Sequence, residues 1–141
     1  MPDILIVADA SSVLAEVRSA LEDEDTEIRE LRSGEAVRRV VEEDPPDLVI
    51  TDLQVGSMGG VAICHDLRLE ESGDRQIHVP VLILLDRRAD VFIAKQCGAE
   101  GWFVKPLDPR RLRKAALTLI DGGTYYDETS KPLATAVRDK A

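Results

Sequence analysis

The sequence has no apolar run near the roughly 20 residues that a helix needs to cross a bilayer. Its first residues, 1–4, also lack the positive region that precedes the apolar stretch of a signal peptide. The first absence excludes a membrane-spanning helix within this sequence, and the second disfavours a secretory signal. We therefore expect a cytoplasmic protein with no membrane partner.

Positive charge is also in short supply. The 18 lysines and arginines are outnumbered by 27 aspartates and glutamates, which gives a formal net charge of -9 at pH 7. The phosphate backbone of a nucleic acid attracts cationic surfaces, so we expect no nucleic-acid partner. The acidic balance is compatible with a metal ion or a basic protein partner.

Cysteines and the common cofactor motifs are scarce as well. Cys64 and Cys97 have neither the spacing of a metal site nor the number needed for a disulfide framework, so we interpret them as small apolar side chains on helices. No Gly-x-Gly-x-x-Gly fingerprint, Walker loop or nucleophile elbow is present. These absences disfavour a small α/β enzyme or cofactor protein, and we expect no enzymatic activity.

What the sequence does contain is a regular alternation of strand-length apolar runs with segments of helical periodicity. The predicted strands cover residues 4–7, 27–31, 48–51, 81–85 and 102–104. A helix is predicted after each of them, beginning near Ser11, Ser33, Gly60, Ala89 and Asp108. Ser11 or Ser12 is expected to cap the first of these helices, and the fourth is predicted over about residues 89–97. Five such units predict a flavodoxin-like, doubly wound α/β fold, with a five-stranded parallel sheet and five helices.

The last predicted helix has the clearest boundaries. Asp108 supplies a capping carboxylate, Pro109 suits the first helical position, and Gly122 follows the last apolar position. We assign residues 1–121 to one domain and residues 122–141 to a polar, mobile C-terminal tail with at most one short helical turn.

Two carboxylates and an ammonium group follow the first, third and fifth predicted strands. In a doubly wound fold, ligands bind beyond the carboxyl ends of the strands, and these ends carry Asp9, Asp52 and Lys105. A carboxylate beside a buried strand needs a compensating cation, which either Lys105 or a divalent metal such as Mg²⁺ could supply. Each aspartate alone could equally cap a helix or a loop, but the three residues together favour a functional site.

Four stretches resemble the receiver domains of two-component response regulators, and the resemblance covers about residues 3–120. They are ILIVAD at 4–9, PDLVITDLQVGSMGG at 46–60, VPVLILL at 79–85 and GAEGWFVKPLDPRRL at 98–112. The resemblance implies that Asp52 is the phospho-acceptor for a histidine kinase or another phospho-donor. It implies that Asp9, Asp52 and the backbone carbonyl of Gln54 bind Mg²⁺. It also implies that Lys105 pairs with the phosphorylated aspartate and that the Lys105–Pro106 bond is cis.

The implied chemistry suits these residue types. A carboxylate attacks phosphorus in line, while the metal and Lys105 neutralise the charge on the equatorial oxygens. The added charge then biases a two-state arrangement of a loop and a strand.

Four features depart from the family pattern. Ala8 stands where a second acidic residue is usual, which should weaken Mg²⁺ binding. Leu85 replaces the threonine or serine whose hydroxyl bonds the phosphoryl oxygen, and Asp86 replaces a small residue. The glycine-rich loop 55–60 lacks the usual proline and aspartate and should be more flexible. Leu85 and Trp102, the aromatic residue that would turn inward, are the two switch positions, and Leu85 fills the path between them.

Two functional hypotheses follow. The first is an atypical stand-alone receiver in a two-component phosphorelay that accepts a phosphoryl group on Asp52 and signals through protein–protein contacts. The second is a phosphorylation-independent pseudo-receiver that serves as an interaction module. Asp52 and Lys105 favour the first, whereas Ala8 and Leu85 favour the second. For either, the resemblance implies an output-protein or homodimer surface around Trp102 and the basic last helix.

Overall fold

The computed structural model describes residues 2–55, 58–72 and 78–127. Its strands are β1 (Asp3–Val7), β2 (Glu27–Leu31), β3 (Leu48–Asp52), β4 (Val81–Leu85), β5 (Gly101–Val104) and β6 (Tyr125–Tyr126). Its α-helices are α1 (Ser11–Leu21), α2 (Val37–Glu43), α3 (Gly60–Ser72), α4 (Val91–Ala94) and α5 (Pro109–Ile120). Single 3-10 turns at Gly34–Ala36 and Arg88–Asp90 lead into α2 and α4.

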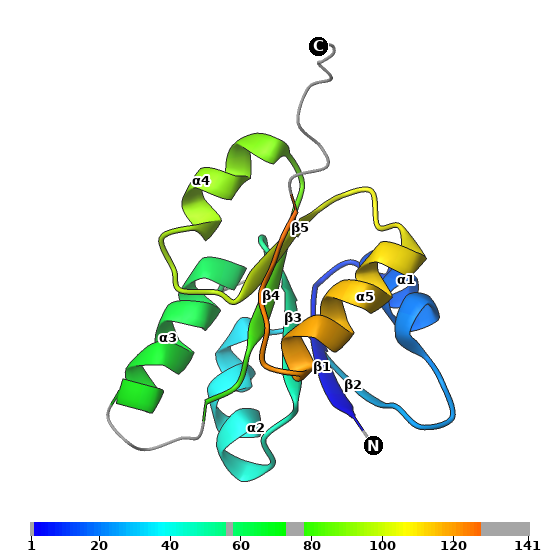
Figure 1. Ribbon diagram of the computed structural model, residues 1–141. Helices are drawn as coiled ribbons and strands as arrows, with labels where there is room; N and C mark the ends of the chain where they lie inside the picture. Colours follow the sequence, from blue (N-terminus) through cyan, green and yellow to red (C-terminus); the bar gives the residue numbers. More distant parts are fainter. Residues whose placement is uncertain (1, 56–57, 73–77, 128–141) are drawn as a thin grey trace.

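The strands form one parallel sheet in the order β2-β1-β3-β4-β5-β6. Helices α1 and α5 cover one face of this sheet, and α2, α3 and α4 cover the other (Figure 1). The strand order reverses between β1 and β3, so this is the edge where a doubly wound fold binds its ligands. The predicted α/β fold is confirmed, with a sixth strand added to the five expected.

The two faces of the sheet carry separate hydrophobic clusters. Ile50 and Leu82 pack with α1 and α5, whereas Val49 and Ile83 on the same strands pack with α2 and α3. Strands β3 and β4 are buried along their whole length, because helices cover both faces and successive side chains alternate between them. In the part of the chain that the structure describes, no helix combines the length and the apolar character needed to span a bilayer.

Helix boundaries follow the sequence at α5 and depart from it elsewhere. Asp108 caps α5, and its Oδ1 accepts hydrogen bonds from the backbone N–H groups of Arg110 and Arg111 at 3.0 and 3.4 Å. At α1 the expected serine cap is wrong, because Ala10 is the N-cap residue and Ser11 already begins the helix. Helix α4 is shorter than the predicted 89–97, and the chain after it turns toward Gly98, whose φ of +79° favours glycine.

The end of the described chain differs most from expectation. Tyr125 and Tyr126 form β6, which pairs in parallel with β5, and the Tyr126 ring stacks on Trp102 with 4.3 Å between centroids. The first part of the predicted tail therefore extends the sheet and forms no helical turn. The rest of the predicted tail, residues 128–141, lies outside the described residues.

Candidate functional site

The carboxyl ends of four strands meet at one edge of the sheet. Asp52 is the last residue of β3 and lies opposite Leu84 of β4, and β1 ends beside β3 with Val7 opposite Thr51. The chain passes from β4 directly into Asp86 and from β5 directly into Lys105. Strand register thus brings together residues that are distant in sequence.

Asp52 is held at this edge in a nearly buried position. Its side chain is 10% exposed, and its Oδ1 accepts hydrogen bonds from the backbone N–H of Leu53 at 3.1 Å and from Lys105 Nζ at 2.9 Å. A carboxylate stripped of most of its water needs such partners. Lys105 is therefore in direct contact with the carboxylate at the predicted phospho-acceptor position.

Lys105 bridges two carboxylates. Its Nζ donates to Asp52 and also to Asp86 Oδ1 at 2.8 Å. Burial lowers the pKa of Lys105, but the hydrogen bonds and charges of Asp86 and Asp52 outweigh burial and raise the pKa above its ordinary value. The Lys105–Pro106 bond is cis, as the resemblance implied. Asp86 therefore turns toward the site and competes with Asp52 for the same ammonium group.

Asp9 and Gln54 border a neighbouring hollow of about 420 Å³, which Leu53, Val55 and Gly59 complete. Asp9 is exposed, and the guanidinium group of Arg32 donates to its backbone oxygen at 2.9 Å. Two of the three predicted metal ligands thus line one hollow, and the third, Asp52, immediately precedes Leu53. Within residues 2–55, 58–72 and 78–127, no group of three or more histidine, cysteine or acidic side chains could hold a metal ion. Two carboxylates and a carbonyl are hard oxygen donors that suit Mg²⁺, which usually keeps several waters.

Two of the unusual positions are buried in the core. Leu85 is 0% exposed and packs in the same cluster as Val104 and Trp102. Ala8 is 1% exposed and packs in the opposite cluster, with α1 and α5. An acidic side chain at position 8 would have to leave this cluster to reach a metal. Neither residue can donate a hydrogen bond or ligate a metal through its side chain.

The glycines of the loop after Asp52 allow a close backbone approach. A Cβ atom at Gly60 would lie 2.7 Å from the Asp52 carbonyl oxygen, and one at Gly59 would lie 2.7 Å from that of Leu53. Gly60 N–H donates to the Leu53 carbonyl at 2.9 Å. Residues 56 and 57 lie outside the described residues, so the flexibility expected of this loop stays a prediction.

Trp102 does not occupy the exposed position that a contact residue needs. It is 5% exposed beneath Tyr126, and its buried Nε1 has no hydrogen-bond partner in the described part of the chain. Tyr126 itself is 44% exposed. Of the two stacked rings, the exposed one is therefore Tyr126.

Asp127 is a buried charge that sequence reasoning missed. Its side chain is 0% exposed, its Oδ2 accepts the backbone N–H of Val104 at 2.9 Å, and its Oδ1 accepts Arg111 at 2.7 Å. The Arg111 guanidinium group also lies 4.9 Å above the Phe103 ring. Burial lowers the pKa of Arg111, while Tyr125 and Asp127 raise it to a net value above the ordinary one. One arginine of the basic last helix is thus engaged within the fold.

Comparison with known proteins agrees with this geometry. Residues 4–117 match the response regulator receiver domain. The chain is 26% identical to the alkaline phosphatase synthesis transcriptional regulatory protein PhoP of Bacillus subtilis, over 83% of this chain and 48% of that protein. The first curated relatives are all longer, and the chain spans 61% or less of their length.

Solved structures show the same fold. The receiver domain of a signal transduction histidine kinase from Syntrophus aciditrophicus has a TM-score of 0.75 and 27% identity, covering 86% of this chain and 92% of that one. The chemotaxis response regulator CheY4 of Vibrio cholerae has a TM-score of 0.72 and 25% identity, covering 85% and 98%. With its fold, its strand-end carboxylates and its family match in agreement, the chain belongs to the response regulator receiver domains.

Proposed function

We propose that the protein is an atypical receiver in a two-component phosphorelay, which accepts a phosphoryl group on Asp52 from a histidine kinase or another phospho-donor. The 2.9 Å contact between Lys105 Nζ and Asp52 Oδ1 carries this proposal. An ammonium group already in place beside the acceptor can neutralise the charge that develops on the transferred group without reorganisation. The cytoplasmic location and the stand-alone organisation stay predictions.

The transfer uses few protein groups. An Asp52 carboxylate oxygen attacks phosphorus in line, an O–P bond forms, and the donor's bond to phosphorus breaks with its electron pair leaving on the donor. Lys105 neutralises the negative charge on the equatorial oxygens of the phosphoryl group. Mg²⁺ bound by Asp9, Asp52 and the carbonyl of Gln54 would supply further positive charge to the phosphoryl oxygens.

Asp86 opposes this reaction. Its carboxylate accepts one of the hydrogen bonds that Lys105 donates, and its negative charge lies near the position that the phosphoryl group on Asp52 would take. The Asp86 side chain is 51% exposed, so it can turn into solvent when Lys105 moves to the phosphoryl oxygens. We expect transfer that is slower than it would be with a small residue at position 86.

Signalling follows through protein contacts on the surface around Trp102 and the last helix. Because Trp102 is buried, the exposed side chains in this region are Tyr126 on β6 and, on α5, Arg110, Lys114 and Leu117. The two α5 cations suit an output protein or a second copy that presents acidic residues, and Tyr126 suits a hydrophobic patch.

Phosphorylation can be tested directly. The protein is incubated with Mg²⁺ and acetyl phosphate, and intact mass and Trp102 fluorescence are followed. We expect a mass gain of one phosphoryl group in the wild type, none in Asp52→Ala, and a faster gain in Asp86→Asn, which frees Lys105. The proposal would be refuted if neither the wild type nor Asp86→Asn gained mass.

A phosphorylation-independent interaction module is the second candidate. It is supported by Leu85, which is fully buried and has no hydroxyl, and by Asp86, which engages Lys105 without a phosphoryl group. Under this alternative, partner binding is the same in the wild type and in Asp52→Ala, and acetyl phosphate changes neither.

A further inference from the structure

Two thiols that the phosphoryl chemistry does not use lie side by side between α3 and the turn after α4. Cys64 is 0% exposed and Cys97 is 7% exposed, and neither forms a disulfide. Cys64 Sγ donates a hydrogen bond to the Cys97 carbonyl at 3.2 Å. The side chain of Cys64 thus reaches a residue 33 positions away, and both cysteines belong to one hydrophobic cluster.

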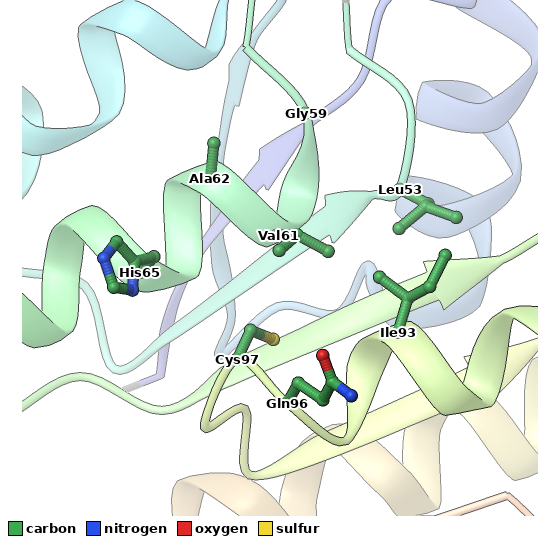
Figure 2. Close-up of a pocket in the computed structure, with 8 residues that line it drawn as sticks. All are labelled: Leu53, Gly59, Val61, Ala62, His65, Ile93, Gln96 and Cys97. Atoms are coloured by element: carbon green, nitrogen blue, oxygen red, sulfur yellow. The ribbon is translucent and has the colours of Figure 1, made fainter.

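One of the two cysteines, Cys97, borders a cavity. A cavity of about 540 Å³ lies between α3 and α4 (Figure 2), and Cys97 forms part of its wall together with Leu53, Gly59, Val61, Ala62, His65, Ile93 and Gln96. The volume is within the range of small-molecule sites. A reagent that enters this cavity meets Cys97, whereas Cys64 is covered.

The surroundings of the two thiols shift their pKa values in opposite directions. The neighbouring Cys64 side chain, helped by the backbone N–H of Ala99 and the charge of Arg68, lowers the pKa of Cys97 to about 7 against the opposing effect of burial. The Cys97 side chain and burial raise the pKa of Cys64. At neutral pH, Cys97 is the nucleophile and Cys64 remains a thiol in contact with it.

We propose that Cys97 and Cys64 are a reversible redox pair, in which a low-molecular-weight disulfide reacts with Cys97 through the α3–α4 cavity and Cys64 completes an intramolecular disulfide. Disulfides in cytoplasmic proteins are usually transient and of this sensing kind.

The two exchange steps balance. The Cys97 thiolate attacks one sulfur of the reagent, the S–S bond of the reagent breaks, and one thiolate leaves with the electron pair. Cys64 then loses its proton, attacks the Cys97 sulfur and expels the second thiolate. Two protein thiols are oxidised, one disulfide is reduced to two small thiols, and those thiols take up the two protons.

The disulfide would join α3 to the turn after α4. In this turn the Cys97 thiol donates a hydrogen bond to the carbonyl of Ala94, the last α4 residue, at 3.2 Å. The carbonyl of the next residue, Gly98, accepts a hydrogen bond from Arg68 Nε of α3 at 3.2 Å. Cys64, Cys97 and Trp102 belong to the same buried cluster, so disulfide formation should alter Trp102 fluorescence.

The test treats the folded protein with glutathione disulfide and maps its peptides without reduction. We expect a Cys64–Cys97 cross-link in the wild type, accompanied by the loss of two hydrogen atoms and reversed by dithiothreitol. Cys64→Ala should stop at one glutathione on Cys97, and Cys97→Ala should leave Cys64 unmodified. Thermal unfolding of both variants under reducing conditions verifies that they are folded.

A second pair of variants tests the route of entry. Ala62→Phe places a large side chain in the cavity wall and should slow the reaction at least about fivefold, whereas Ala15→Phe, at an exposed α1 position, should not. The proposal fails if the folded wild type does not react while the urea-unfolded protein does. It also fails if both cysteines carry glutathione without a cross-link, or if Ala62→Phe reacts at the wild-type rate.

Discussion

Asp52 and Asp127 are two nearly buried aspartates, each paired with a cation, but they differ in how the hydrogen bonds are distributed over their carboxylate oxygens. Asp127 has one carboxylate oxygen bonded to Arg111 and the other to the backbone of β5. In Asp52, the hydrogen bonds donated by Leu53 and by Lys105 both end on Oδ1.

The cations differ as well. Arg111 lies over an aromatic ring and stacks within the fold, whereas Lys105 divides its charge between Asp52 and the half-exposed Asp86. A guanidinium group fixed in this way holds one geometry, whereas an ammonium group on a flexible stem can be transferred between acceptors. A carboxylate with hydrogen bonds to both of its oxygens and a fixed cation is typical of a structural role. A carboxylate that is hydrogen-bonded through one oxygen and shares its cation can acquire a new group.

The largest effect on stability is expected from Asp127→Asn. The amide nitrogen would face either the Val104 N–H or Arg111, so one buried donor loses its acceptor and Arg111 loses its charge partner. We expect the free energy of unfolding to fall by about 3 kcal/mol, below the top of the range for buried pairs because Arg111 is a third exposed. Urea denaturation measures the loss, and Trp102 fluorescence should show that Tyr126 has moved away.

Asp121→Asn is the control for that prediction, because Asp121 is exposed at the end of α5, the helix that carries Arg111. It should change the free energy of unfolding by less than about 0.5 kcal/mol. If Asp127→Asn were equally mild, the contacts of Asp127 would not contribute to holding β6 on β5.

The second largest effect is expected from Leu85→Thr, which adds to the Asp52 site the hydroxyl that it lacks. Removing buried methyl groups and burying a hydroxyl should cost about 2 kcal/mol of unfolding free energy. The aspartyl phosphate should nevertheless form to a higher level, which intact mass after acetyl phosphate treatment measures. Leu84→Thr is the matched control, since Leu84 is equally buried but faces the α1–α5 cluster. A gain in both variants, or in neither, would contradict this role for position 85.

The sequence predicted the central strands well, because continuous apolar runs such as 81–85 have few alternatives inside an α/β fold. It did not predict β6. Two tyrosines among polar residues carry no strand periodicity, and the strand depends on contacts of Asp127 with residues 16 and 23 positions away. Helix α4 was overestimated for a related reason, since its last turn ends early where Cys97 and Gly98 contact α3.

The candidate site was predictable in its residues and not in its bonds. The resemblance placed Asp52 and Lys105 correctly at two strand ends. It could not show that Asp86 turns toward Lys105, because a half-exposed side chain after a strand can point either way. Trp102 was expected on an exposed surface, since nothing in its own segment indicates that Tyr126 covers it.

A smaller effect on stability is expected from Asp52→Asn, the counterpart of Asp127→Asn. The amide oxygen of the substituted side chain can still accept the Leu53 N–H, and Lys105 keeps its bond to Asp86. We expect the free energy of unfolding to change by no more than about 1 kcal/mol, although phosphorylation is lost. A loss as large as that of Asp127→Asn in urea denaturation would show that the two aspartates are equally structural.

The smallest effect is expected from pH. The folded-state pKa of Lys105 is raised above its ordinary value of 10.5, so its contribution to stability is fully present below that value and is lost as the pH rises through the folded-state pKa. Other lysines and tyrosines titrate in the same range, so the informative quantity is the difference in unfolding free energy between the wild type and Lys105→Met. That difference should stay constant up to about pH 10.5 and should shrink above it as the ammonium group loses its proton. Arg111 stays charged throughout this range, so the corresponding difference for Arg111→Met should remain constant. If the Lys105 difference also stayed constant, the bonds to Asp52 and Asp86 would add nothing to folding, and the value of Lys105 would lie in phosphoryl chemistry alone.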